Sequence, residues 1–137
     1  MFTSIFINLG LNDLFMGKAL ELVNRFYDLT NNKNTTKGLE ELLAQEMTFA
    51  GPLLRTSGAK QYVEMQGQFL KFHKTWKMIK QFEDADDVCS IYELNLGMPS
   101  GGSFSVVIVD WIRVSNGHIS DQQIYYDPRE FAKAFGM

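Results

Sequence analysis

The residue with the clearest potential for chemistry is Asp110, which stands in the middle of a long apolar segment, Phe104 to Val114. Apart from Asp110, every second residue of this segment, including Ile108 and Ile112, is apolar, which predicts a strand with one buried face. Asp110 shares that phase. Burial in an apolar cavity would raise the pKa of its carboxyl and make it a hydrogen-bond donor. The alternative is a structural carboxyl that anchors a backbone group or a tyrosine hydroxyl.

The last predicted strand, Ile119 to Tyr126, carries polar groups at alternate positions. Gln122, Ile124 and Tyr126 share one face because side chains alternate along a strand. They would supply neutral polar contacts in a mostly apolar cavity, as ligand sites often do. The alternative is that this face is sheet surface or a dimer contact.

Trp111 and Tyr125 fall in the opposite phase and would lie on the outer face of the sheet. Large apolar groups exposed together are typical of a contact surface. We therefore expect a homodimer formed through the outer sheet face.

Other chemical motifs are weak in this chain. Neither His73 nor His118 belongs to a Ser-His-Asp pattern or a zinc-ligand cluster, and no Gly-rich phosphate loop precedes a helix. The acidic run from Glu83 to Asp87 lacks the spacing of a calcium loop and predicts a solvated turn. We expect neither a metal nor a cofactor.

The 137 residues suit a single domain, 1–137, with an ordinary hydrophobic content of 45%. Eleven Phe residues exceed the need of a small core and favour a large core or an aromatic-lined cavity. A net charge of -3 without a basic block argues against nucleic acid as a partner. The single cysteine, Cys89, excludes an internal disulfide, and no apolar run is long enough to span a membrane. The cytoplasm is the expected location.

Hydrophobic periodicity and turn signals predict helices first and a sheet afterwards, which is the α+β class. A cap at Asn12-Asp13 begins the first helix, and residues 1–12 are expected to form a loosely ordered extension. Asn116-Gly117 is a hairpin signal, and Asp127-Pro128 begins a last helix. The predicted helices are 13–30, 37–43, 59–73 and the segment after Asp127; the predicted strands are 46–50, 76–82, 88–96, 104–114 and 119–126.

This pattern resembles the nuclear-transport-factor-two-like superfamily, and within it the SnoaL-like group. The resemblance spans Gly17 to Met137 and is carried by Val23-Asn-Arg-Phe-Tyr-Asp-Leu, Met47-Thr-Phe-Ala-Gly-Pro and the closing run from Asp110 to Phe131. It implies a cone-shaped, curved antiparallel sheet wrapped around N-terminal helices, the cystatin-like or ketosteroid-isomerase-like α+β barrel, with a deep pocket. Members include ketosteroid isomerases, limonene epoxide hydrolases and polyketide cyclases.

The catalytic positions of ketosteroid isomerases are only partly kept. The general-base aspartate of these enzymes corresponds to Gly51, which has no side chain to move a proton. Their helix-one tyrosine, an oxyanion donor, corresponds to Phe26, which cannot donate, although Tyr27 is adjacent. Their protonated aspartate matches Asp110. Steroid isomerisation by that mechanism is therefore not expected.

Limonene epoxide hydrolases use an Asp-Arg-Asp set that aligns with Glu93, Ile91 and Ile124. Only one acid, Glu93, is retained. The arginine and the second acid that the epoxide hydrolase mechanism needs are replaced by isoleucines. A polyketide cyclase needs one pocket acid, and either Asp110 or Glu93 would supply it.

We expect a protein with an apolar pocket that binds a small hydrophobic molecule. The alternatives are an isomerase, cyclase or hydrolase acting on a polyketide-, steroid- or terpene-like substrate through Asp110 with Glu93 as a candidate partner, and an interaction module. The residues expected to contact the bound molecule are Phe26, Tyr27, Phe49, Tyr62, Phe69, Tyr92, Ile108, Asp110, Ile112, Gln122, Ile124 and Tyr126.

Overall fold

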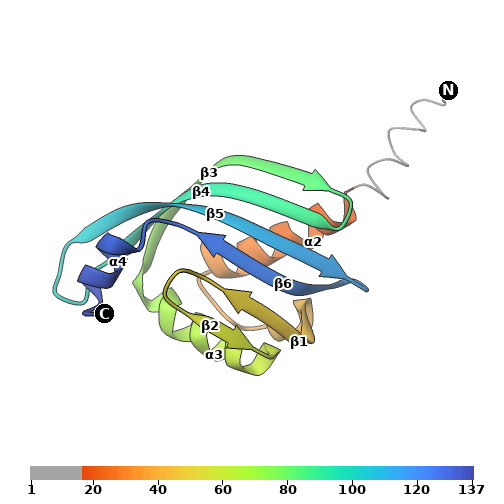
Figure 1. The fold of residues 1–137 in the computed structure, drawn as a ribbon, viewed down its shortest axis with the longest axis horizontal. Helices are drawn as coiled ribbons and strands as arrows, with labels where there is room; N and C mark the ends of the chain where they lie inside the picture. Colours follow the sequence, from red (N-terminus) through yellow and green to blue (C-terminus); the bar gives the residue numbers. More distant parts are fainter. Residues whose placement is uncertain (1–16) are drawn as a thin grey trace.

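The computed structural model describes residues 17–137, and its main feature is a curved sheet that wraps around two helices (Figure 1). These helices are α2, Lys18–Tyr27, and α3, Ala59–Phe69. A π-helical turn, Asp28–Asn32, extends α2, and single 3-10 turns at Glu40–Leu42 and Leu70–Phe72 lead into strands. The last helix, α4, spans Pro128–Ala134. The predicted α+β class is confirmed.

The six-stranded sheet has the order β2-β1-β6-β5-β4-β3. Neighbouring strands pair antiparallel except β1 and β6, which run parallel. The sheet is therefore mixed, where an antiparallel one was expected, and it is open, with β2 and β3 as its edges. The strands are β1 (Leu43–Ala50), β2 (Arg55–Ser57), β3 (His73–Asp84), β4 (Asp87–Gly97), β5 (Ser103–Ser115) and β6 (His118–Tyr125).

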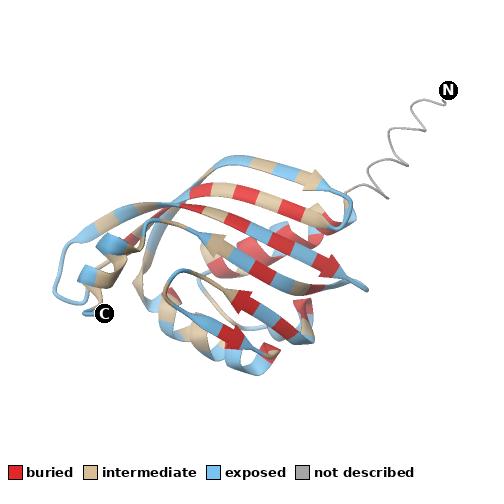
Figure 2. Cartoon of the chain, viewed as in Figure 1, coloured by how far each residue is buried: buried red, intermediate tan, exposed pale blue. Residues whose placement is uncertain are grey.

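Burial alternates along the central strands, which shows which face of the sheet is the inner one (Figure 2). In β5, Ile108, Asp110 and Ile112 are buried, whereas Val107 and Trp111 on either side are exposed. This alternation follows from the two-residue period of a strand with one buried face. The phase predicted for Asp110 from the sequence is confirmed.

Two tight turns set the register of the long strands. Asn116 and Gly117 both have positive φ, 53° and 77°, which a two-residue turn matched to strand twist requires. The β3–β4 hairpin turns at Ala85, whose φ is 55°. The predicted turn at Asn116-Gly117 is confirmed.

Helix α2 buries one apolar face, as its helical spacing indicates: Leu22, Val23, Phe26 and Tyr27 are all buried. Its first turn is tied to the sheet, because the backbone N–H of Leu20 donates to a carboxylate oxygen of Glu83 at 2.9 Å. The acidic run is thus not wholly solvated: Glu83 satisfies a helix N–H that would otherwise lack a partner.

Some expected boundaries were wrong. Helix α3 ends at Phe69 and not at residue 73, and β3 begins at His73 and not at residue 76. The loop after Pro52 contains the short strand β2. The cap at Asn12-Asp13 and the extension 1–12 lie outside the described residues.

Helix α4 begins as expected, with the Asp127 carboxylate accepting the backbone N–H of Arg129 at 3.1 Å. Its aromatic residues reach back to the first half of the chain. The rings of Phe131 and Phe69 are 5.3 Å apart, and those of Phe135 and Phe72 are 4.7 Å apart. The C-terminus is thereby packed against the end of α3 (Figure 1).

Among the described helices, none has the length and apolar composition that crossing a bilayer requires.

Candidate functional site

Asp110 is fully buried at the centre of a hydrogen-bond network. One of its carboxylate oxygens, Oδ2, accepts from the hydroxyls of Tyr27 at 2.8 Å and Tyr92 at 3.1 Å. The side-chain amide of Gln122 donates to both carboxylate oxygens at 3.0 Å. The three donors come from α2, β4 and β6, so the carboxylate joins the first helix to the middle of the sheet.

A second layer fixes the amide of Gln122. The Tyr62 hydroxyl donates to its carbonyl oxygen, and the Gln66 amide donates to that hydroxyl at 2.7 Å. The carbonyl of Gln122 therefore faces Tyr62, and its N–H groups face Asp110. All these donors point towards Asp110, an arrangement suited to an ionised carboxylate.

Burial dominates the acid–base properties of this network. It raises the pKa of Asp110 to about 6, although the hydrogen bonds from Gln122, Tyr27 and Tyr92 oppose the rise. Burial, and then the nearby negative charge of Asp110, raise the pKa values of Tyr27 and Tyr92 well above the usual tyrosine range. Near pH 7 the arrangement is one carboxylate held by neutral hydroxyl and amide donors.

A cavity of about 490 Å³ lies between the sheet, α2, α3 and α4. This volume is within the usual range for small-molecule sites. Its wall is mainly apolar and aromatic. The sequence-predicted residues that line it are Phe26, Tyr27, Phe49, Phe69, Tyr92, Ile108, Gln122, Ile124 and Tyr126.

Three residues expected at the cavity lie behind its wall instead. Tyr62 and Ile112 are buried in the core, and Asp110 is covered by the residues that donate to it. The physical reason is the high cost of a buried carboxylate without partners, which the chain avoids by surrounding Asp110 with donors. Tyr27, Tyr92 and Gln122 both donate to Asp110 and line the cavity.

Glu93 does not join Asp110. It lies exposed on the outer face of β4, because its neighbours Tyr92 and Leu94 point inward and side chains alternate along the strand. The expectation that Glu93 shares a site with Asp110 was wrong.

Gly51, at the position where the resemblance would place a general base, lines the cavity. A Cβ at this residue would lie 3.1 Å from Cγ1 of Ile124. The wall is therefore closely packed here, and the residue has no side chain that could move a proton.

Sequence reasoning missed much of the opposite wall. Leu94, Leu96 and Val106 could have been found, because they share strand phase with Tyr92 and Asp110. Apolar spacing or exposure marked Leu53, Leu54, Met65, Phe72, Phe131 and Phe135 as candidates for a core, rim or wall position, but did not place them at this cavity. The remaining lining residues had no local signal: Thr30, Asn31, Gln66, Gln68 and Met137.

His73 also lines the cavity, at the start of β3, where it caps the 3-10 turn Leu70–Phe72. Burial lowers its pKa to about 4, so the imidazole is neutral near pH 7. Both ring nitrogens are buried without a hydrogen-bond partner in the described part of the chain, and the ring packs edge-on against Phe69 with centroids 5.1 Å apart.

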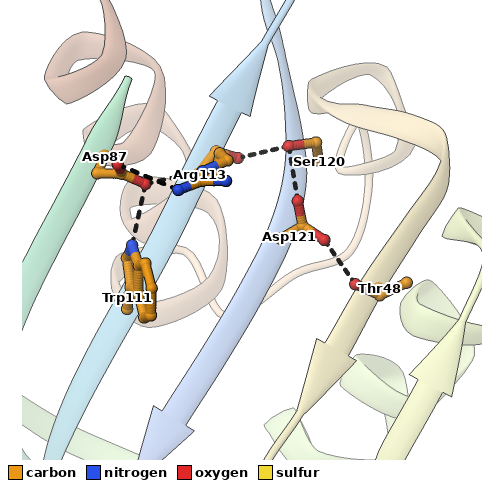
Figure 3. Close-up of polar contacts among 6 residues, drawn as sticks. All are labelled: Thr48, Asp87, Trp111, Arg113, Ser120 and Asp121. Carbon is orange, nitrogen blue, oxygen red and sulfur yellow. Dashed lines mark hydrogen bonds and ion pairs between the residues drawn. The ribbon is translucent and has the colours of Figure 1, made fainter. Parts of the chain in front are cut away.

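The outer sheet face carries a separate set of groups (Figure 3). The indole N–H of Trp111 donates to Asp87 at 3.0 Å, and Arg113 forms an ion pair with the same carboxylate. Asp121 accepts from Thr48 across the parallel β1–β6 pair at 2.7 Å. Exposed apolar side chains surround these groups: Ile79, Phe82, Val107, Trp111 and Tyr125.

Within residues 17–137, no group of three His, Cys, Asp or Glu side chains is arranged to hold a metal ion.

The fold of this chain is similar to that of known SnoaL-like and NTF2-like proteins. The model of the SnoaL-like domain family matches residues 23–122. A protein of unknown function from Cytophaga hutchinsonii, described as NTF2-like, is 26% identical, with a TM-score of 0.70 over 82% of this chain and 93% of that one. No curated protein matches significantly.

Two other solved structures share the fold at lower identity. A putative SnoaL-like polyketide cyclase from Jannaschia is 13% identical, with a TM-score of 0.76 over 88% of this chain and 93% of that one. A hypothetical protein from Catenulispora acidiphila with a ketosteroid-isomerase-like fold, in complex with trimethylamine, is 17% identical, with a TM-score of 0.69 over 85% and 93%.

The carboxyl of Asp110 is expected to titrate near pH 6, observed by carbon NMR of the side chain. Below about pH 3 it is largely protonated in both the folded and the unfolded state. As pH rises towards 6, the unfolded chain ionises while the folded one keeps its proton, so the free energy of unfolding falls. The expected loss from this group is roughly 3 kcal/mol, complete above about pH 6.

Asp110→Asn removes the titrating group, so its free energy of unfolding should lack this pH-dependent component. Glu93→Gln is the matched control and should retain it. A midpoint at the ordinary aspartate value near 3.8 would contradict the expectation.

Proposed function

The chain belongs to the SnoaL-like domain family, and from this premise we propose that it binds a small hydrophobic molecule in the cavity between its sheet and helices. The observation that carries the proposal is the cavity of about 490 Å³ with a mainly apolar, aromatic wall. Gln122, Tyr27 and Tyr92 give this wall a few polar groups on one side, which would orient the molecule. The relative from Catenulispora acidiphila, in complex with trimethylamine, supports small-molecule binding by this fold.

A second candidate is catalysis on a hydrophobic substrate related to polyketides, steroids or terpenes, by an isomerase, cyclase or hydrolase. It is favoured by the pKa of Asp110, about 6, which is close to the range that general acids and bases use at neutral pH. Because Asp110 lies behind the wall, a proton would pass through the hydroxyl of Tyr27 or Tyr92. The relatives include a putative polyketide cyclase, which supports this candidate at the level of fold.

The outer sheet face supports a homodimer as a further part of the proposal. Ile79, Phe82, Val107, Trp111 and Tyr125 are each between 42% and 53% exposed and lie on the same side of the sheet. A groove of about 310 Å³ beside Trp111 and Tyr125 would receive side chains of a second copy.

Ile124→Trp is expected to abolish binding of the neutral fluorescent probe N-phenyl-1-naphthylamine. Ile124 lines the cavity beside Gly51, so an indole there would occupy the space for a ligand. Probe fluorescence is measured during titration with protein. Ile79→Trp, on the outer face, is the matched control and should bind as the wild type does. Absence of probe binding by the wild type would favour the interaction module.

Asp110→Asn is expected to abolish any turnover found when hydrophobic ketones, epoxides and polyketide-like esters are screened. The amide keeps the size of the side chain but cannot exchange a proton with the tyrosines. Glu93→Gln should retain full turnover, because Glu93 faces the other side of the sheet. Turnover that survives in Asp110→Asn would exclude the catalytic candidate.

The wild type is expected to sediment at twice the chain mass of 15.7 kDa, and Tyr125→Glu as a monomer. The added charge would face the apolar groove and oppose a dry contact. Ser100→Glu, in the exposed β4–β5 loop, adds the same charge and should leave the dimer intact. A monomeric wild type at micromolar concentration would contradict the dimer.

A further inference from the structure

The buried charge of Asp110 has no cation beside it in residues 17–137. Its hydrogen-bond partners Tyr27, Tyr92 and Gln122 are neutral, and the ion pairs of the described chain lie on the exposed surface. The other titratable groups close enough to feel this charge, Tyr62 and Cys89, have raised pKa values and are also neutral near pH 7. Asp110 is therefore a fully buried negative charge with no cation beside it in the described residues.

The two tyrosines transmit this charge to the cavity. Each uses its hydroxyl hydrogen for Asp110, at 2.8 Å from Tyr27 and 3.1 Å from Tyr92, and both residues line the cavity. Their hydroxyl oxygens retain lone pairs that can accept a hydrogen bond but have no further hydrogen to donate. At these two oxygens a ligand carbonyl or carboxylate would meet lone pairs, whereas an N–H group would find acceptors. A nearby donor of the wall is the side-chain amide of Asn31, whose nitrogen is buried without a partner in the described residues.

The aromatic rings around this point favour positive charge as well. The rings of Phe26, Tyr27 and Tyr92 all line the cavity; their centroids are 5.4 Å apart for Phe26 and Tyr27 and 5.5 Å apart for Tyr27 and Tyr92. Ring faces attract cations, and the attraction is larger where water is excluded. Elsewhere the cavity wall offers apolar contacts from side chains such as Leu94, Leu96 and Val106.

We propose that the molecule bound in the cavity is a protonated amine with an apolar body, its N–H groups donating to the hydroxyl oxygens of Tyr27 and Tyr92 in front of the Asp110 carboxylate. The proposal rests on the proposed binding function and names the chemical class of its ligand. The ammonium supplies the positive charge that the described chain does not place beside Asp110, and the apolar body fills the rest of the cavity.

The test compares three probes that differ only in their polar end: 4-phenylbutylamine, 4-phenylbutanol and 4-phenylbutanoate. Dissociation constants are measured by calorimetry at pH 7.5. The amine is expected to bind about tenfold or more tightly than the alcohol, because Asp110 attracts the ammonium group and little water lies between them to screen the attraction. The carboxylate is expected to bind most weakly, because Asp110 repels its negative charge. In Asp110→Asn the preference for the amine over the alcohol should disappear. In Glu93→Gln it should remain.

A pH series on the wild type gives the same information without a substitution at Asp110. The amine stays protonated from pH 5 to 7.5, whereas the Asp110 carboxyl gains a proton below about pH 6. The ratio of the amine and alcohol affinities is therefore expected to fall towards one at pH 5. Protonation of Asp110 is coupled to release of the cation, because both neutralise the same charge.

Three outcomes would overturn the proposal. They are equal or tighter binding of the alcohol or the carboxylate at pH 7.5, an amine preference that persists in Asp110→Asn, and an affinity ratio that does not change with pH. If the alcohol and N-phenyl-1-naphthylamine bind but the amine has no advantage, only the ligand class is wrong. If no probe binds at all, the proposed binding function fails together with it.

Discussion

The fold depends on one constraint, which is that a carboxylate placed inside an apolar cone must be surrounded by donors. Asp110 meets this condition with groups from α2, β4 and β6, so the inner helix and the centre of the sheet are joined at a single point. One of these donors, Gln122, is in turn held by Tyr62, and Tyr62 by Gln66, both from α3. The network is thus shared by every element that surrounds the cavity on this side, and the polarity of the cavity wall is a consequence of how the carboxylate is satisfied.

The sheet allows this arrangement because one of its faces is buried against the helices and the other is exposed. Alternation along β4 and β5 sends Tyr92 and Asp110 inward while Glu93 and Trp111 face outward. The curvature then closes the inner face around α2 and leaves the outer face as a broad exposed surface with the Asp87–Arg113 ion pair (Figure 3). Ligand binding and self-association, as proposed, would use opposite faces of the same strands and would therefore be separable by substitution.

The sequence predicted those features that depend on local spacing. The phase of Asp110 and the inward face of α2 follow from strand and helix periods, and the turn at Asn116-Gly117 follows from its residue types. The curvature of the sheet was predicted from the resemblance to the SnoaL-like group and not from local spacing. Features set by contacts between distant segments were not accessible: the parallel β1–β6 pair, the bond of Tyr62 to Gln122, and the packing of Phe131 against Phe69. Glu93 was misplaced because a match of position to a relative carries no information on which face a side chain occupies.

Within residues 17–137, β3 is a long edge strand whose outer backbone groups pair with no other described strand. Such edges are hazards for fibril growth in proteins that do not protect them. Here Lys74, Lys77 and Lys80 are exposed along the edge, and the pairing with β4 is irregular between Met78 and Lys80. Positive charge and a local distortion both oppose the addition of another strand. The cone can therefore stay open on one side without inviting uncontrolled polymerisation.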